Sequence, residues 1–455
     1  MITLYNSLTK QKEVFTPLKA GQASIYSCGP TVYDHAHIGN LRAYLFADLL
    51  QRTLRHIEDL KVAWVMNITD IDDKMIARAA HDYPDDEPMV ALGKLADKFT
   101  DLFLDDLEAI GVQRADIHKL PRATDHIESM QKLIRHLMSG SIAYESHGSV
   151  YFSLSKYQAS GKDYGVLSDI HFEGQSRVID DQDQKEGVGD FALWKAAKDG
   201  EPFWQFSLDG KQLPGRPGWH IECSAMSTDY LGKPFDIHTG GIDLKFPHHT
   251  NEIAQSGGDL ARYFLHNEFL NISGEKMAKS SGNFYRLADI GDGMAYRLLV
   301  LSAHYRTKMD FSLDNVAAAR QRLSTLCEFV RKNQYATELV DNAAVIDAFR
   351  RDFTAALRDD LNTPQAFAAL AALERDGVRV HGAVEAVAWA DRVLGLGLVG
   401  DTQPFSDQEL ALQQLRAEAR LNSDYVASDR LRDELGKLGV ETEDLASGSQ
   451  YWRST

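Results

Sequence analysis

Two hydrophobic patterns alternate over the first hundred residues of the chain. Apolar runs that suit strands, "ASIYSC" and "VAWVMNIT", are followed by amphipathic stretches at 41–56 and 91–110. Strands that alternate with helices predict a parallel α/β sheet. The same alternation returns with "PFDIHTGGIDLKF" and with a helix that begins at about Pro247, since proline suits the first position of a helix.

The pattern changes twice further along the chain. Between about 115 and 217 it becomes β-rich, with "IAYESHGSVYFSL", an acidic run "DDQDQKEG" and a Gly/Pro-rich exit "LPGRPG", which predicts an insertion within the sheet domain. After about 285 nearly every segment has helical period, as in "NVAAARQRLSTLCEFVRK", which predicts a helical bundle. The Gly-punctuated stretch "LGLGLVGDTQPFSD" then predicts a linker to a small C-terminal module.

Composition narrows the class of protein. A chain of 455 residues has room for two or more hydrophobic cores. A hydrophobic share of 44%, a charged share of 25% and the lack of a long apolar run are typical of soluble proteins and predict no membrane association. The start, "MITLYNSLTK", does not have the pattern of an export signal, so we expect the protein in the cytoplasm.

Cysteine content and charge add two exclusions. Three cysteines cannot form a disulfide framework in so long a chain, which leaves metal binding or reactivity as their functional roles. The formal charge of -17 argues against indiscriminate binding of polyanions, because that binding needs clustered Lys and Arg. A local basic path on an acidic protein is still compatible with this charge.

Two fragments are candidates for phosphate binding. In "HAHIGNLRAY", His37 and Asn40 stand at the start of a predicted helix, where free N–H groups and the helix dipole favour an anion, and Gly39 lets a ligand approach closely. In "SGEKMAKSSGN", Lys276 and Lys279 offer two cations for a triphosphate or a departing pyrophosphate. A capped helix with a surface histidine, and a pair of solvated lysines, explain the same fragments, so neither decides the function alone.

A second set of residues is a candidate metal site. In "FPHHTNEIAQ", His248 and Glu252 are four residues apart and project from one face of a helix. Imidazole and carboxylate at this spacing make half of a zinc site, and Cys223 in "GWHIECSAM" and Cys28 at the end of the first strand offer thiolates. The alternative is a helix-surface pair and two buried thiols. Cys327, on an amphipathic helix, is expected in the core.

The stretch "NITDIDDK" follows the second predicted strand and supplies Thr69, Asp70, Asp72 and Asp73. Carboxyl ends of strands are where open α/β sheets bind ligands, so a cation site is conceivable here. We favour the simpler interpretation that these carboxylates cap a helix.

Taken together, these fragments resemble the cysteinyl-tRNA synthetases, which are class I aminoacyl-tRNA synthetases, over essentially the whole chain. "CGPTVYDHAHIGN" is similar to the first signature of the class, which usually ends His-Ile-Gly-His, and "KMAKS" is similar to its Lys-Met-Ser-Lys-Ser loop. "RPGWHIECSAM", "FDIHTGGIDLKFPHHTNEIAQS" and "NITDIDDK" resemble stretches of the cysteine-specific members. The tail from "RAEARLNSDYVASDRLRDEL" onward resembles the anticodon-binding region of that family.

The resemblance implies ATP-dependent activation of L-cysteine to cysteinyl-adenylate and its transfer to the 3′ end of tRNA(Cys) by a monomer. It implies one Zn²⁺ per chain, held by Cys28, Cys223, His248 and Glu252, and Mg²⁺ that accompanies the ATP. Catalytic roles fall on His37, Asn40, Lys276 and Lys279, and ATP contacts on these four together with Gly39 and Asp243. Contacts with the amino acid fall on Gly29, Thr69, Trp219 and His238.

The resemblance also implies how the chain divides into domains. A Rossmann-like catalytic domain would be split between 1–115 and 217–265, with an inserted connective subdomain at 116–216. A connecting region with the lysine loop would span 266–315, the helical bundle 316–400 and the anticodon-binding module 401–455.

Three residues depart from the family pattern. Asn40 stands where a histidine is usual, and an amide cannot become cationic. Ala278 replaces the serine of the loop, and Ser423 stands where a lysine is common. Two other functions stay open at this point. One is an ATP-dependent ligase that attaches cysteine to an acceptor other than tRNA, and the other, which Asn40 and Ala278 favour, is a zinc-stabilised RNA-binding protein without catalysis.

Overall fold

The computed structural model describes residues 1–167, 185–272, 274–276, 284–336, 338–401, 403–445 and 448–453. The chain forms two compact units, which are described separately below. The first contains Met1–Gly293 and Tyr305–Phe311, and the second contains Met294–His304 and Ser312–Thr455. The finer division into five domains stays a prediction.

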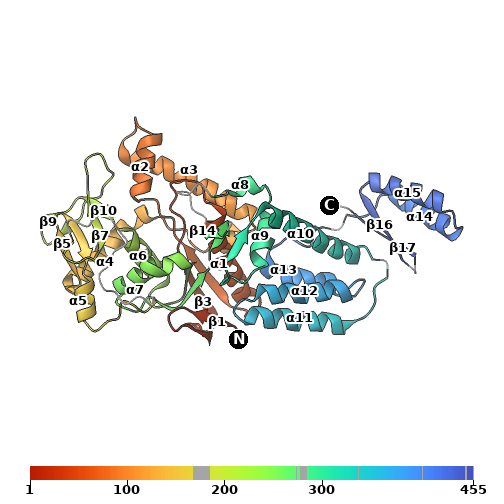
Figure 1. Ribbon diagram of the computed structural model, residues 1–455, viewed down its shortest axis with the longest axis horizontal. Helices are drawn as coiled ribbons and strands as arrows, with labels where there is room; N and C mark the ends of the chain where they lie inside the picture. Colours follow the sequence, from red (N-terminus) through yellow and green to blue (C-terminus); the bar gives the residue numbers. More distant parts are fainter. Residues whose placement is uncertain are drawn as a thin grey trace. The chain divides into compact units, whose positions relative to one another are not determined.

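The centre of the first unit is a four-stranded parallel sheet (Figure 1). Its strands are β3 (Gln22–Ser27), β4 (Lys61–Met66), β11 (Phe235–Gly241) and β12 (Ala261–Asn267), in the order β12-β11-β3-β4. Ser27 pairs with Met66 on one side and with Thr239 on the other, so the carboxyl ends of the strands lie at one edge. The predicted parallel α/β sheet is confirmed.

Helices connect these strands as the amphipathic patterns predict. Helix α1 (Ile38–His56) joins β3 to β4, α6 (Trp219–Leu231) precedes β11, and α7 (Thr250–Gln255) precedes β12. The segment that begins near Pro247 is not a single regular helix, because a short π-helical turn, η5 (Lys245–His249), precedes α7 and Phe246 has extended backbone angles. Beyond β4, α2 (Asp73–Asp82) and α3 (Pro88–Ala109) pack against each other.

An antiparallel sheet is inserted between α3 and α6. Its strands are β5 (Ala143–Ser146), β6 (Ser149–Phe152), β7 (Phe191–Ala196) and β10 (Gly215–Pro217), in the order β10-β7-β6-β5. Helices α4 (Ile127–Ser139) and α5 (Leu154–Ala159) and the short pair β8 (Ser207–Leu208) and β9 (Lys211–Gln212) complete this part. The β-rich insertion predicted from the sequence is thus present.

The remaining elements of the first unit are small. A hairpin, β1 (Thr3–Asn6) and β2 (Gln11–Val14), opens the chain. Strands β13 (Leu270–Ile272), β14 (Glu275–Lys276) and β15 (Met309–Phe311) form a three-stranded sheet, and α8 (Leu287–Ile290) follows β14 in the chain. Helix α9 (Gly293–Leu301) leads into the second unit.

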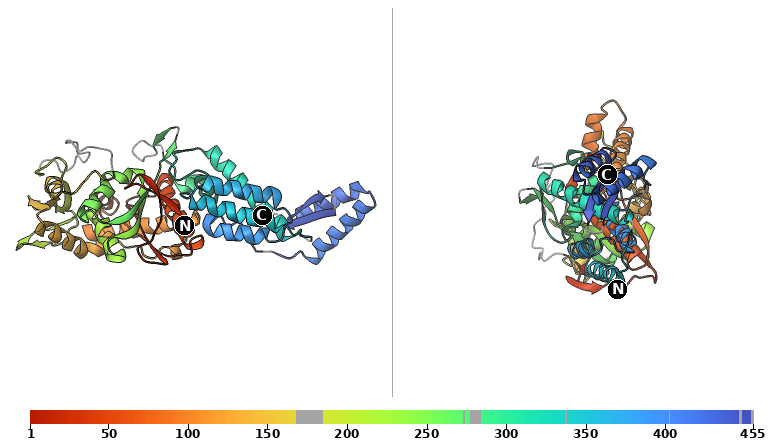
Figure 2. Two further views of the ribbon diagram at one scale, coloured as in Figure 1. Left: turned by 90° about the horizontal axis from the view of Figure 1, so that it is seen from below. Right: turned by 90° about the vertical axis from the view of Figure 1, so that its right-hand side faces the viewer.

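The second unit is helical (Figure 2). Its bundle contains α10 (Leu313–Gln334), α11 (Ala343–Arg358), α12 (Thr363–Asp376) and α13 (Ala383–Leu394). Ring contacts among Phe349, Phe353 and Trp389 fill part of its core. The C-terminal residues form α14 (Asp407–Leu421), α15 (Tyr425–Lys437) and a hairpin of β16 (Val440–Leu445) and β17 (Gly448–Arg453).

Within the described ranges, every helix is too short or too polar to cross a lipid bilayer.

Candidate functional site

Four side chains of types that can ligate a metal come from distant parts of the sequence and meet near the carboxyl end of β3. Cys28 follows β3, Cys223 lies on α6, His248 lies on η5 and Glu252 lies on α7. Their ligand atoms all lie within 4.8 Å of one another. The two sulfurs are 3.8 Å apart, Cys28 Sγ is 3.8 Å from Glu252 Oε1, and His248 Nε2 is 3.0 Å from the same oxygen.

These spacings fit a tetrahedral metal. A zinc ion with bonds of about 2.3 Å to sulfur holds its two sulfurs about 3.8 Å apart. Among the described residues, His248 Nε2 has no hydrogen-bond partner, although it faces Glu252 at ion-pair distance. A buried nitrogen of this kind costs free energy unless it meets a ligand. The donor set of two thiols, one imidazole and one carboxylate therefore fits zinc.

The pKa shifts of the four side chains are also consistent with a bound divalent cation. Burial raises the pKa of the Cys28 thiol and of the Glu252 carboxyl, and it lowers the pKa of His248 well below its usual range. The largest single effect on the pKa of Cys223 is the hydrogen bond with Cys28, which lowers it, but burial and the nearby carboxyl groups of Glu252 and Glu222 together outweigh it, and the net shift of the pKa is upward. The protein alone thus shifts the two thiols and the carboxyl group towards their neutral forms. A divalent cation reverses that preference, because thiolate and carboxylate are the forms that bind it.

Neighbouring side chains hold the ligands in place. His220 Nδ1 is 2.9 Å from His248 Nδ1, and the indole of Trp219 stacks on the His248 ring. His238 Nε2 is 2.8 Å from Glu252 Oε2. Side chains that contact metal ligands in this way fix their orientation and tautomer.

One histidine that the sequence pattern does not single out borders the same cluster. His249 Nε2 is 3.4 Å from Cys28 Sγ, and Cys28, His238, His249 and Glu252 form a second group with metal-ligand spacing. The signal is present as the doubled histidine in "FPHHTNE". Helical spacing selects only His248, because that residue is four positions from Glu252.

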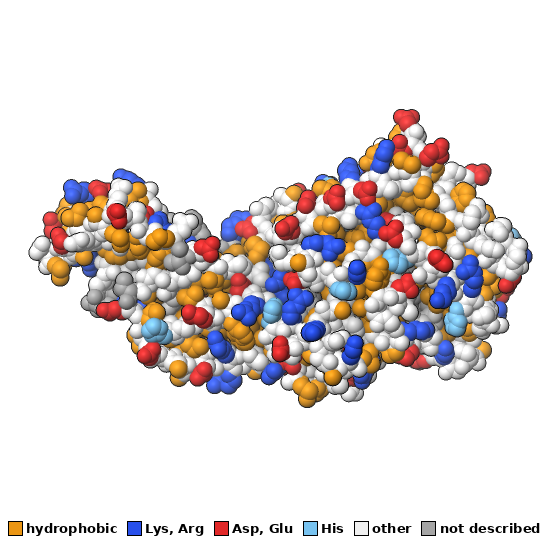
Figure 3. Space-filling view, turned by 180° about the vertical axis from the view of Figure 1, so that it is seen from behind, with side chains coloured by type: hydrophobic (Ala, Val, Ile, Leu, Met, Phe, Trp, Pro, Cys, Tyr) orange, Lys and Arg blue, Asp and Glu red, His pale blue; other side chains and the backbone are white. Residues whose placement is uncertain are grey.

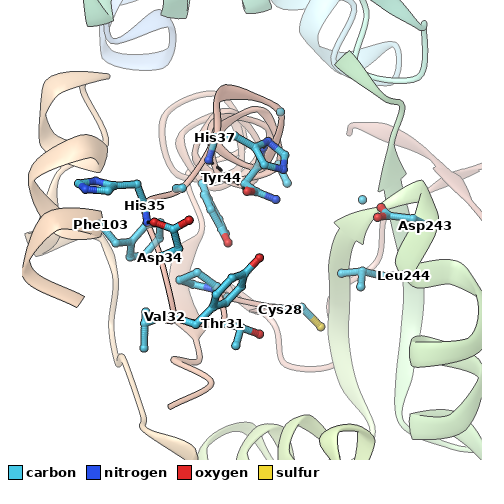
Figure 4. A pocket seen from close by; sticks show the side chains of 18 of the residues that line it. Cys28, Thr31, Val32, Asp34, His35, His37, Tyr44, Phe103, Asp243 and Leu244 are labelled. Carbon is cyan, nitrogen blue, oxygen red and sulfur yellow. Dashed lines mark hydrogen bonds between the residues drawn. The ribbon is translucent and has the colours of Figure 1, made fainter. Parts of the chain in front are cut away.

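A cavity of about 640 Å³ opens above Cys28 (Figure 4). Of the residues proposed from the sequence, seven line it: Cys28, Gly29, His37, Gly39, Asn40, Trp219 and Asp243. Thr69 and His238 are buried and are not among its lining residues. Figure 4 shows His37 at the start of α1 and Asp243 on the opposite side of the cavity.

The start of α1 is both a helix cap and a wall of this cavity. His37 Nδ1 accepts a hydrogen bond from Asn40 N, and Asn40 Oδ1 accepts one from His37 N, at 3.2 and 3.3 Å. The cap that the sequence offered as an alternative is therefore real. It does not exclude an anion site, because both residues line the cavity and the helix presents its positive end there.

Asn67 connects two of the proposed contacts with the amino acid. Its Oδ1 accepts a hydrogen bond from Gly29 N at 2.9 Å, and its Nδ2 donates to Thr69 Oγ1 at 3.1 Å. Thr69 in turn donates to Glu222 Oε2 at 3.1 Å. Gly29 must be glycine, since a Cβ there would lie 1.6 Å from the Asn67 carbonyl oxygen. Asn67 is absent from the residues predicted above because nothing local in the sequence shows that it faces Gly29.

The acidic stretch after β4 caps a helix and connects it to the inserted sheet. Asp72 is the N-cap of α2 and accepts a hydrogen bond from Met75 N at 2.6 Å, as the capping interpretation predicts. Asp73 forms ion pairs with Lys195 and Arg216 of the inserted sheet.

The lysine loop lies mostly beyond the described residues. Lys276 belongs to strand β14, but its side chain is not described. Lys279 and Ala278 lie outside the described ranges. Ser423, between α14 and α15, has a positive φ of 59° and donates its N–H to Arg420 O at 3.0 Å.

The parallel sheet, the cavity at the carboxyl end of β3 and the start of α1 beside it form the catalytic fold of a class I aminoacyl-tRNA synthetase. The fold resembles that of the Mycobacterium tuberculosis methionyl-tRNA synthetase bound by methionyl-adenylate. That likeness has a TM-score of 0.55 and 14% identity, and it covers 86% of this chain and 85% of the other.

Sequence comparisons give the family. Residues 14–321 match the family described as the tRNA synthetases class I (C) catalytic domain. The chain is 43% identical to the cysteine–tRNA ligase of Alkalilimnicola ehrlichii over 100% of both chains, and 39% identical to that of Thermococcus onnurineus over 99% of both. The chain belongs to the cysteine–tRNA ligase family of class I aminoacyl-tRNA synthetases.

Proposed function

We propose that this protein activates L-cysteine with ATP to cysteinyl-adenylate and transfers the cysteinyl group to the 3′ end of tRNA(Cys). The observation that carries the proposal is the cluster of Cys28, Cys223, His248 and Glu252 beside a cavity that also holds the start of α1. A sulfur-binding centre and a phosphate-binding helix end in one cavity suit a reaction that joins cysteine to a nucleotide.

Selection of cysteine follows from the donor set. Zinc, when bound by these four side chains, supplies a soft centre that prefers a thiolate to an alcohol. The chain's own residues supply the rest: Trp219 stacks on His248 and lines the cavity, and Asn67 holds Gly29 and Thr69. We assign Gly29, Thr69, Trp219 and His238 to the amino-acid side of the site. Because sulfur recognition separates cysteine from serine, a hydrolytic editing site is unnecessary.

Activation requires the cysteine carboxylate and the α-phosphate of ATP to be held in line while charge develops on phosphate oxygens. Positioning and electrostatics can supply this without a side-chain nucleophile. The helix end with His37 and Asn40 faces the cavity, with Gly39 between them and Asp243 opposite, so we assign these four to ATP. Lys276 and Lys279 are proposed to hold the phosphates from the loop, together with Mg²⁺ that accompanies the nucleotide.

We propose that the acceptor of the cysteinyl group is tRNA rather than a small molecule. The relatives named as cysteine–tRNA ligases match the chain over its whole length, which includes the C-terminal module of α14, α15 and the β16–β17 hairpin. A ligase for a small acceptor would not need that module. We expect the enzyme to act as a monomer in the cytoplasm.

Two assays test the proposal together. Cysteine-dependent exchange of pyrophosphate into ATP should occur without tRNA, and charging should occur with purified tRNA(Cys), with serine as a poor competitor. Removal of zinc by a chelator should abolish the preference for cysteine, and added zinc should restore it. Exchange without charging would overturn the tRNA proposal, and the lack of both would overturn the enzyme itself.

A further inference from the structure

A second cavity, of about 290 Å³, lies in the first unit and is separate from the catalytic cavity. Its walls come from α4, α5 and α7, from the residues that follow each of these helices, and from the turn between α6 and β11. Within the described chain, none of its lining residues also lines the cavity above Cys28. The function proposed above does not use this second cavity.

The side chain of Gln255 lines the second cavity and offers a buried hydrogen-bond donor. Gln255 belongs to α7 and is 1% exposed. Its Oε1 accepts a hydrogen bond from Ser224 Oγ at 2.5 Å, but its Nε2 has no partner among the described residues. A buried donor without a partner costs free energy. An oxygen atom of a ligand in the cavity would remove that cost.

Two lysines line the same cavity. Lys233 Nζ donates a hydrogen bond to Ser256 O at 3.2 Å. Lys162 Nζ lies 5.7 Å from the centre of the Tyr157 ring. Both lysines are exposed, and neither forms an ion pair with a carboxylate of the described part of the chain. Their charges are therefore available to an anion that enters the cavity.

The lining of the cavity contains no acidic side chain among the residues that the structure describes. Besides the two lysines it includes His136. This lining contrasts with the rest of a protein that has 66 Asp and Glu against 49 Lys and Arg. On the face shown in Figure 3, acidic side chains lie among the basic ones over much of the surface. Basic groups gathered in a concave site attract anions locally, even when the net charge is -17.

The size and lining of the cavity select a class of ligand. A volume of about 290 Å³ suits a small molecule and is too small for a peptide or a nucleic-acid strand. Leu137, Ile142 and Ala254 add apolar wall to the amide and the lysines. A phosphate or carboxylate group can accept from the amide and meet the lysines, while an apolar remainder of the molecule contacts these three side chains.

Gln255 also connects the second cavity to the metal cluster. On α7 it follows the metal-ligand candidate Glu252 by three residues. Its partner Ser224 follows another candidate, Cys223, on α6. The two helices pack against each other. A ligand that holds the amide of Gln255 would therefore restrain both helices and, through them, two of the four side chains of the cluster.

We propose that the second cavity binds a small molecule with a phosphate or carboxylate group, and that its occupation slows the loss of zinc from the cluster. Gln255 Nε2 donates to an oxygen of the anion, and Lys162 and Lys233 supply positive charge at the exposed side. The proposal adds a site to the proposed function and does not depend on the acceptor of the reaction.

Titration calorimetry on the zinc-bound protein tests the site, with phenyl phosphate and benzoate as probes. We expect at least one probe to bind, and the tighter one identifies the acidic group. The double variant Lys162→Ala, Lys233→Ala should weaken this binding about tenfold. Lys132→Ala is the matched control, because Lys132 is exposed on α4 and lies outside the lining, and it should bind the probe as the wild type does.

Gln255→Met tests the buried donor. Methionine keeps the length of the side chain without its N–H groups, so binding of the probe should weaken about tenfold. Ser224 Oγ keeps a partner in this variant, because it also lies 3.3 Å from His220 O. Binding by Gln255→Met as tight as that of the wild type would show that the amide does not face the ligand, and would overturn the proposal.

The rate at which a chromophoric chelator removes zinc tests the connection to the cluster. A saturating probe should slow this rate at least twofold in the wild type and in Lys132→Ala, but not in the double variant. Cysteine-dependent pyrophosphate exchange by the double variant should stay at the wild-type rate, which also shows that it folds.

Three results would overturn the proposal. Neither probe binds, or the wild type and the double variant bind the probe equally, or ATP displaces the probe completely, which would place it in the catalytic cavity. Binding that leaves the rate of zinc removal unchanged would overturn the connection to the cluster. If the wild type binds the probe but shows neither exchange nor charging, it is the proposed function that fails and not the site.

Discussion

The indole of Trp219 lies on the imidazole of His248, with ring centroids 4.2 Å apart and 26° between the planes. Trp219 is 42% exposed, whereas His248 is 1% exposed, so the indole forms the boundary between the metal cluster and the cavity. Together with the contact between His220 Nδ1 and His248 Nδ1, the stack leaves His248 Nε2 directed at the cluster.

Loss of this stack should loosen the metal. We predict that Trp219→Ala lowers the affinity for zinc about tenfold, since side chains that orient a ligand contribute about that much, and raises the KM for cysteine. Competition with a chromophoric chelator measures the first effect, and pyrophosphate exchange measures the second. Trp219→Phe keeps an aromatic ring and should retain most of both. Equal zinc affinity in the wild type and Trp219→Ala would show that the stack does not position His248.

Gly29 should tolerate no side chain. A Cβ at this position would lie 1.6 Å from the backbone oxygen of Asn67, and backbone cannot move aside as a flexible side chain can. We predict that Gly29→Ala displaces Cys28, lowers the zinc content and reduces the melting temperature by several degrees.

The matched control for this variant is Gly93→Ala. Gly93 lies inside α3, and a Cβ added there would meet no described atom within 4 Å, so alanine should stabilise the helix by about 1 kcal/mol. Thermal unfolding and zinc analysis of both variants check the pair. A zinc content in Gly29→Ala equal to that of Gly93→Ala would contradict the steric explanation.

Replacement of Asn40 by histidine should lower the stability of the protein and raise the rate of cysteine activation. Its side chain completes the capping box with His37, and a histidine there loses the amide oxygen that accepts from His37 N. We predict that Asn40→His costs about 0.5–1 kcal/mol of stability. It should also raise the rate of pyrophosphate exchange several-fold, because an imidazolium stabilises negative phosphate oxygens better than an amide does. If Asn40→His were as stable as the wild type and exchanged pyrophosphate more slowly, both predictions would be contradicted.

The C-terminal hairpin should weaken in acid. A hydrogen bond from the buried Arg416 guanidinium lowers the pKa of Asp444 to about 2. A carboxyl group with a lowered pKa stabilises the folded state above its unfolded pKa of about 4, and this contribution is lost as the pH falls towards about 2.

Asp444→Asn removes that contribution at every pH. Hydrogen exchange of the β16 and β17 amides should therefore be faster in the variant than in the wild type at neutral pH, and the difference should shrink between about pH 4 and about pH 2. A difference that stays constant down to about pH 2 would mean that the charge of Asp444 does not support the hairpin.

Local pattern was sufficient to predict much of the fold and part of the site. Apolar periodicity predicted the parallel strands and α1. The four-residue spacing of His248 and Glu252 predicted that their side chains lie close together, as they do. Pattern alone offered Cys28 and Cys223 only as candidates, because periodicity carries no information on which distant fragments meet. The family resemblance joined them, and their sulfurs do lie 3.8 Å apart.

The residues that the sequence did not reveal act through tertiary contact. Asn67 reaches Gly29 because β3 and β4 are neighbours, and His249 reaches Cys28 because η5 departs from a regular helix. A helical period fitted to "FPHHTNE" cannot anticipate that departure. The roles assigned to the ATP-contacting residues stay predictions that the variants above address.

Recognition of cysteine should depend on a metal that is held by two sulfurs of this chain and that binds the sulfur of the substrate. X-ray absorption at the zinc edge, on the purified protein with and without cysteine, tests this most directly. We predict one zinc per chain with two sulfur neighbours, and a third sulfur neighbour when cysteine is added but not when serine is added. Protein without stoichiometric zinc, or a zinc whose sulfur count does not change with cysteine, would contradict the account.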